Sequence, residues 1–347
     1  MGASESKLAF KEDIFRLSGE PDIPADSPWW VRFYQLPESA EDVFALWSPN
    51  DLRHLTSSDN TTDLRPKKNA ETLIYIAIAR LEALQTRHVH ADPQTPIAPE
   101  VLNCVRILTR LLPYIYEADH LAAWETKFFW EPRKATWVWD KKYNRRGPLF
   151  DGLNPSKRLP DGTDNDEIDR PLGERLIDLL INYLFLPNFA LPKKLDANGN
   201  PDLHVSYSIW QSGIGCKQSQ GMTRENERNA MEVLRLLLTL SSRMMYLPSS
   251  KSDLGGKSTG VWTNADCRTD MVAQIDIKAL TYITTQCSRQ AVLSLICSLL
   301  NTVSPTITKS SPGPLAQLHD RSSNITLPLG EFRLILQLSH ETPNNFS

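Results

Sequence analysis

Apolar residues return every three or four positions along most of this 347-residue chain, and this spacing constrains its fold more than any other feature. The pattern is clearest at 73–84, 101–115, 172–184, 233–245 and 292–300. Each stretch is typical of a helix with one buried face. Since no strand-like alternation stands beside them, we predict an all-α fold, an irregular stack of antiparallel amphipathic helices. Such helices often stack as solenoids of the armadillo or HEAT type, although the sequence shows no clean repeat.

Local signals mark several helix starts in the first half of the chain. Ser39 with Asp42 resembles a capping box, and Ser48 before Pro49 is typical of the next start. An aromatic-rich stretch from Trp29 to Tyr34 is expected to be helical and to pack in the core. Further helices are predicted at about 121–130, from Pro171 until Pro187 stops it, from Thr223 to Tyr246, at 274–284 and at 289–301. Pro113 is expected to kink or end the helix that carries it.

We divide the chain into three parts. Residues 1–20 form an N-terminal segment, 21–303 a helical domain, and 304–347 an atypical tail expected to be disordered. The helical domain is interrupted by long polar loops near 132–170 and 249–264, which are rich in Pro, Gly, Ser and charged residues.

Composition excludes several classes of protein. A net charge of −3 excludes a generally basic nucleic-acid binder. The five cysteines are scattered without a C-x-x-C pair, so neither a disulfide framework nor a zinc site is indicated, which fits the cytosol. We expect no signal peptide and no membrane-spanning helix, because no run approaches about 20 apolar residues.

The motifs that suggest chemistry fail on inspection. His88 and His90 are predicted to follow the end of a helix, and no acidic or cysteine ligand stands nearby in sequence. Gly255 to Thr259 resembles a phosphate-binding loop, but Lys251 occupies the position of its first glycine. The acidic residues between Asp161 and Asp169 lack the spacing of a calcium loop. We therefore predict no catalytic residue, no cofactor, no metal site and no enzymatic activity.

The first residues match a lipidation pattern. Met1-Gly2 followed by Ser6 and Lys7 is typical of N-myristoylation, in which Met1 is removed and the Gly2 amine is acylated. The segment from Lys7 to Leu17 is predicted to be a short amphipathic helix. It either docks as the first helix of the bundle or lies on a membrane surface, and its mixed charges do not make it polybasic. Gly2 is the one functional residue that we predict.

Short blocks along the chain carry a resemblance. In order they are Met1-Gly2 with Ser6-Lys7-Leu8, Glu41-Asp42-Val43-Phe44, Leu102-Asn103-Cys104 with Arg106, Leu108-Thr109-Arg110 with Leu112-Pro113-Tyr114-Ile115 and Glu117, Ile209-Trp210 with Gly213-Ile214-Gly215, Met245-Tyr246-Leu247-Pro248, and Ser298-Leu299-Leu300-Asn301-Thr302-Val303. Together they resemble the high-temperature-induced dauer formation protein family, dymeclin-related cytosolic proteins of the Golgi. Family members are much longer, so the chain resembles their N-terminal part, and the residues after Val303 do not share the resemblance.

The resemblance implies a helical, N-myristoylated protein bound peripherally to the cytoplasmic face of the Golgi, with a cytosolic pool. It also implies a non-catalytic role in protein sorting and secretory-vesicle trafficking, with protein partners that the sequence does not identify. The alternative is a helical scaffold that recruits a regulatory enzyme to Golgi membranes. Arg106, Arg110 and Glu117 are expected to form salt bridges or to face a partner rather than to form a site.

Overall fold

The computed structural model describes residues 3–57, 66–90, 97–134, 168–193, 202, 204–210, 222–246 and 277–308. Gly2 and the predicted loop near 249–264 lie outside these residues. So does the predicted loop near 132–170 except for its ends, and the predicted tail 304–347 beyond residue 308.

The described residues form an all-α protein, as predicted. Its helices are α1 (Ala3–Gly19), α2 (Val31–Gln35), α3 (Ala40–Leu46), α4 (Pro49–Thr56), α5 (Lys68–His90), α6 (Ala98–Glu117), α7 (Ala122–Trp130), α8 (Leu172–Leu184), α9 (Arg224–Ser241), α11 (Lys278–Thr285) and α12 (Arg289–Thr308), with 3-10 turns η1 (Pro28–Trp30), η2 (Asp119–Leu121) and η6 (Arg243–Met245). Two strands, β1 (Arg133–Lys134) and β2 (Ile168–Asp169), pair antiparallel, so the two ends of the predicted polar loop lie side by side.

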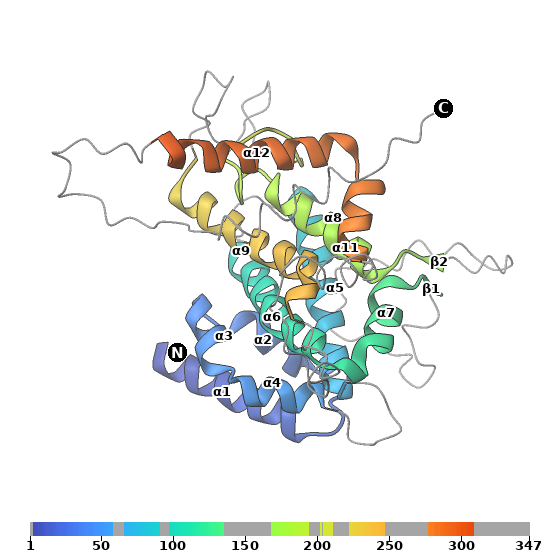
Figure 1. Ribbon diagram of the computed structural model, residues 1–347. Coiled ribbons are helices and arrows are strands. Elements are labelled where there is room, and N and C mark those ends of the chain that lie inside the picture. The colour runs from blue at the N-terminus through green and yellow to red at the C-terminus, as the bar shows by residue number, and fades with distance from the viewer. Residues whose placement is uncertain are drawn as a thin grey trace, which may run out of the picture.

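Helix α6 is the centre of the fold. It packs against α2, α3, α4, α5, α7 and α9, and Figure 1 shows it crossing the middle of the molecule. This position follows from its sequence, because most of its residues are apolar and buried from Val101 to Tyr116. Pro113 does not end the helix, which continues to Glu117. Helices α1 and α4 lie along one edge of the molecule, and α12 lies along the opposite edge (Figure 1).

The capping predictions are confirmed. Ser39 and Asp42 form a capping box at α3, and Ser48 and Asp51 form another at α4, with Pro49 at its first turn. The aromatic cluster is core, as expected. The Trp30 and Phe33 side chains are fully buried, and their ring centroids lie 6.2 Å apart.

Removing the α4 cap should cost a modest amount of stability. The Ser48 hydroxyl accepts the Asp51 backbone N–H, so Ser48→Ala is expected to lower the free energy of unfolding by about 1 kcal/mol. Urea denaturation followed by tryptophan fluorescence measures this. Ser57→Ala at the other end of α4 is the control, since the Ser57 hydroxyl only donates to the His54 carbonyl of the same exposed turn. Equal losses in the two variants would contradict the capping role.

Three helix ends differ from the prediction. His88 and His90 were expected after a helix end, but α5 includes both, which makes that placement wrong. His88 is buried, its Nε2 donates to the Pro187 carbonyl at 3.2 Å, and burial lowers the pKa of the ring. Helix α9 ends at Ser241 and is followed by η6, short of Tyr246. Helix α12 runs on to Thr308, past its predicted end at residue 301.

Candidate functional site

The first helix is where the predicted lipidation site meets the folded protein. Gly2 itself lies outside the described residues, and α1 begins at the next residue, Ala3. Ser6, the second landmark of the acylation pattern, is buried and donates to Glu38 at 2.9 Å. The residues of the pattern therefore run directly into a helix that is part of the fold.

The inner face of α1 is docked, which confirms one of the two alternatives raised from the sequence. Phe10, Ile14 and Leu17 are fully buried, and the Phe10 and Phe33 ring centroids lie 5.8 Å apart in an edge-to-face arrangement. Asp13 accepts hydrogen bonds from Trp29 Nε1 and from the guanidinium of Arg32, both at 2.8 Å. Burial nevertheless raises the pKa of Asp13, because desolvation outweighs these contacts.

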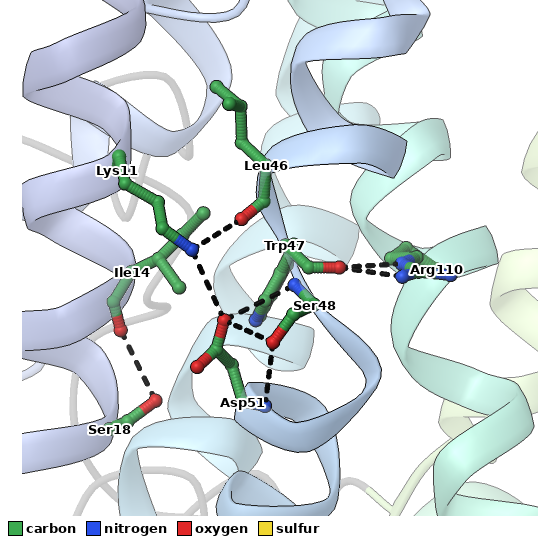
Figure 2. Close-up of polar contacts among 8 residues, drawn as sticks. All are labelled: Lys11, Ile14, Ser18, Leu46, Trp47, Ser48, Asp51 and Arg110. Atoms are coloured by element: carbon green, nitrogen blue, oxygen red, sulfur yellow. Dashed lines mark hydrogen bonds and ion pairs between the residues drawn. The ribbon is translucent and has the colours of Figure 1, made fainter.

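Polar contacts hold α1 against the corner between α3 and α4 (Figure 2). Lys11 Nζ donates to the Leu46 carbonyl at 2.7 Å and lies 3.4 Å from Asp51 Oδ2. From the other side, Arg110 of α6 donates through two nitrogens to the Trp47 carbonyl. Burial alone would raise the pKa of Asp51, but hydrogen bonds from Ser48 and the charge of Lys11 outweigh it and lower the pKa. The corner is thus fixed between α1 and α6.

The basic side chains of α1 form ion pairs and hydrogen bonds with other residues of the protein. Besides Lys11, Lys7 pairs with Asp42 at 3.2 Å and Arg16 pairs with Glu20 at 2.7 Å. The contacts of Lys7 and Lys11 reach α3 and α4, so together with the buried inner face they fix which residues of α1 face outward.

The outer face of α1 exposes two large apolar side chains. Leu8 is 63% exposed and Phe15 is 58% exposed, and the Lys11 ammonium lies 4.7 Å from the Phe15 ring centroid. Glu5 and Glu12 are exposed on the same side of the helix. We call these four residues the outer face of α1. The sequence named Leu8 and Phe15 as apolar members of the helix but did not indicate that they point away from the core.

A second exposed apolar stripe lies on α12, at the opposite edge of the molecule (Figure 1). Leu293 is 51% exposed, Leu300 is 49% exposed, and Ile296 lies between them. The inner face of α12 is held by buried Ala291, Leu295 and Ser298, and the Ser298 hydroxyl accepts the Trp210 backbone N–H at 3.0 Å.

A polar pocket of about 470 Å³ lies between α8, α11 and the start of α12. Asp178 lines it and accepts hydrogen bonds from Arg170 at 2.9 Å and from the Tyr282 hydroxyl at 3.0 Å. Burial and the Asp178 carboxylate raise the pKa of the Cys287 thiol to about 12, so this thiol stays protonated and is a poor nucleophile. The pocket escaped the sequence reasoning because its lining comes from segments that are distant in sequence.

The charged residues of the sequence blocks between Leu102 and Glu117 have structural roles. Arg106 is buried and lies 3.7 Å from Glu232 of α9, while Glu117 pairs with Arg53 of α4 at 3.0 Å. Arg110 binds the Trp47 carbonyl. Of the two expectations, salt bridges account for Arg106 and Glu117, and a backbone carbonyl accounts for Arg110.

Among the described residues, no helix combines the length and the apolar character needed to cross a bilayer. Within the same residues, no group of three or more His, Cys, Asp or Glu side chains could hold a metal ion.

Comparison with known proteins gives consistent matches along the chain. The family model described as Hid1, high-temperature-induced dauer-formation protein, matches residues 1–311. Protein HID1 of Mus musculus is 30% identical over 87% of this chain, which corresponds to 32% of the mouse protein. Ubp5-interacting protein ftp105 of Schizosaccharomyces pombe is 27% identical over 99% of this chain and 39% of its own length.

These matches extend the resemblance past Val303, where we expected it to end. The chain spans between about a third and two fifths of the length of the curated relatives it matches. No solved structure matches it. The chain belongs to the Hid1 family of high-temperature-induced dauer-formation proteins.

Proposed function

We propose that this protein is a non-catalytic, N-myristoylated peripheral membrane protein of the cytoplasmic face of the Golgi, with a cytosolic pool. Its role is in protein sorting and secretory-vesicle trafficking, where its helical body serves as a scaffold for protein partners. The observation that carries the membrane part of the proposal is the placement of the acylation pattern. Gly2 directly precedes a docked helix at the edge of the molecule, whose outer face exposes Leu8 and Phe15.

A second candidate function is a scaffold that brings a regulatory enzyme to Golgi membranes. The name of the S. pombe relative favours it, because that name states an interaction with another protein, Ubp5. Proximity labelling of the chain with and without Gly2 separates the two candidates. Cargo and coat components among the labelled proteins would favour trafficking, whereas one dominant enzyme would favour recruitment.

Replacing Gly2 with alanine should release the protein from membranes. Alanine cannot be acylated by this route, so the variant loses the association constant of about 10⁴ M⁻¹ that a single myristoyl chain supplies. We expect a fluorescent fusion to change from perinuclear puncta to diffuse cytosol. Ala3→Ser, which keeps Gly2 and Ser6, is the control.

Intact-mass analysis of the chain purified from its native cells tests the same proposal directly. The expected mass carries one myristoyl group and lacks Met1. A bare amino terminus, or puncta that persist in Gly2→Ala, would refute acylation as the anchor.

A further inference from the structure

A single myristoyl chain binds membranes only marginally, so a stable anchor requires a second signal. The usual second signal is a cluster of basic residues near the acyl group. Helix α1 does not offer one, because Lys7, Lys11 and Arg16 are each engaged by an oxygen of the protein itself. The second contact must therefore have a different chemistry.

Leu8 and Phe15 lie on the same side of α1. They are seven residues apart, which places them roughly 20° apart around the helix and roughly 10 Å apart along it. The helix begins at Ala3, immediately after the acylated residue Gly2. Leu8 follows Gly2 by six residues, which is less than two turns of helix. The acyl chain and the two apolar side chains would therefore meet one surface at the edge of the molecule.

The charges around Leu8 and Phe15 indicate whether this face suits an anionic or a neutral membrane. Lys7, Lys11 and Arg16 also border this face, but each is paired with a carboxylate, so the charge left in excess beside Leu8 and Phe15 is that of the exposed Glu5 and Glu12. Like charge repels, so this face is unsuited to an anionic membrane and suited to a neutral one. Leu and Phe are residues that insert at the boundary between headgroups and acyl chains.

We infer that Leu8 and Phe15 insert into the interface of an electrically neutral lipid bilayer beside the N-terminal acyl chain, and that they form the second half of the membrane anchor. This role rests on the proposed acylation of Gly2. The docking of α1 pre-orients both side chains, so insertion needs no refolding of the helix. Binding is then driven by apolar contact, with little dependence on anionic lipid or on salt.

The test uses the full chain, acylated by co-expression with an N-myristoyltransferase and verified by intact mass. Vesicles of phosphatidylcholine and phosphatidylethanolamine are the probe, and flotation measures the partition coefficient. Leu8→Ser combined with Phe15→Ser is expected to lower the partition coefficient about tenfold, equivalent to about 1.4 kcal/mol. Phe15→Trp, which keeps an interfacial aromatic, should bind at least as well as the unchanged protein.

The chain provides a matched control pair. Leu293→Ser with Leu300→Ser removes two equally spaced and similarly exposed apolar side chains from α12, and it should leave the partition coefficient unchanged. Replacing part of the neutral lipid with phosphatidylserine should not strengthen binding, and raising the salt concentration should not weaken it. All variants lie at exposed positions, and circular dichroism confirms that each is folded.

The outcomes separate this inference from the acylation proposal. If acylated protein binds, Gly2→Ala does not, and the Leu8/Phe15 variant binds like the unchanged protein, the inference is overturned and acylation stands. The inference also fails if the α12 pair causes the same loss, or if binding requires phosphatidylserine. If the acylated protein binds no better than Gly2→Ala, both proposals fail.

Discussion

Replacing Arg106 with methionine is expected to lower the free energy of unfolding by about 3 kcal/mol, although this residue lies on no functional surface. Arg106 is buried in α6, where its guanidinium lies 3.7 Å from Glu232 of α9 and donates to Asn103 Oδ1 at 3.1 Å. Removing the cation leaves the buried Glu232 carboxylate with the half-exposed Arg235 at 3.5 Å, so its charge is compensated only in part. A buried charge that loses its buried partner costs much more than the pair itself contributes. Urea denaturation followed by tryptophan fluorescence measures the loss.

The double variant Arg106→Met with Glu232→Met should recover most of this loss. Replacing both ions by apolar side chains of similar volume removes the desolvation penalty together with the attraction. Arg235→Met is the control and should change the free energy of unfolding by less than about 1 kcal/mol, because that guanidinium is half-exposed and its ion pair is screened by solvent. If the double variant is as unstable as the single one, Arg106 acts through Asn103 and packing instead of through Glu232.

Asn103 shows why α6 tolerates a buried polar group at all. Its amide donates to the carbonyls of Tyr34 and Pro37, which come at the end of α2 and after it, and its oxygen accepts from Arg106. One polar chain thus links α2, α6 and α9 at the centre of the fold. Asn103 and Arg106 therefore hold the central helix to its neighbours on both sides.

Most helices could be predicted from the sequence because the spacing of apolar residues within a helix shows which of its faces is buried. The spacing of Leu73 to Leu84 and the Ser39–Asp42 capping box both involve residues that are close in sequence, and each corresponds to a helix in the structure. The partners of charged residues are decided by tertiary packing instead. Nothing local indicates that Arg106 meets Glu232 across the α6–α9 contact, or that His88 lies inside α5 against the Pro187 carbonyl.

Of the candidate site, the acylation pattern could be predicted from the sequence and the outer face of α1 could not, for the same reason. The acylation pattern at Gly2 can be read from a few residues, because the transferase itself reads a short segment. The outer face of α1 cannot be predicted in this way, because α1 carries the exposed apolar residues Leu8 and Phe15 as well as the buried Phe10 and Ile14. Only the contacts of Lys11 and Asp13 with neighbouring elements decide which apolar residues turn inward.

Asn69→Ala is expected to loosen the C-terminal end of α1 and to lower the free energy of unfolding by about 3 kcal/mol or more. Asn69 is fully buried at the start of α5, and its amide donates to the carbonyls of Leu17 at 3.1 Å and Glu20 at 2.7 Å. Its oxygen accepts the Ile23 backbone N–H at 2.9 Å. Alanine would leave all three backbone groups without this partner, and each buried unsatisfied group costs about 1–3 kcal/mol.

Hydrogen exchange localises this loss. Amides of α1 should exchange faster in Asn69→Ala, because the side chain ties the end of α1 and the following connector to α5, whereas α9 amides should change less. Thr72→Ala is the control, since the Thr72 hydroxyl donates only to the Lys68 carbonyl of its own helix. Uniform acceleration across both helices would contradict a local tether.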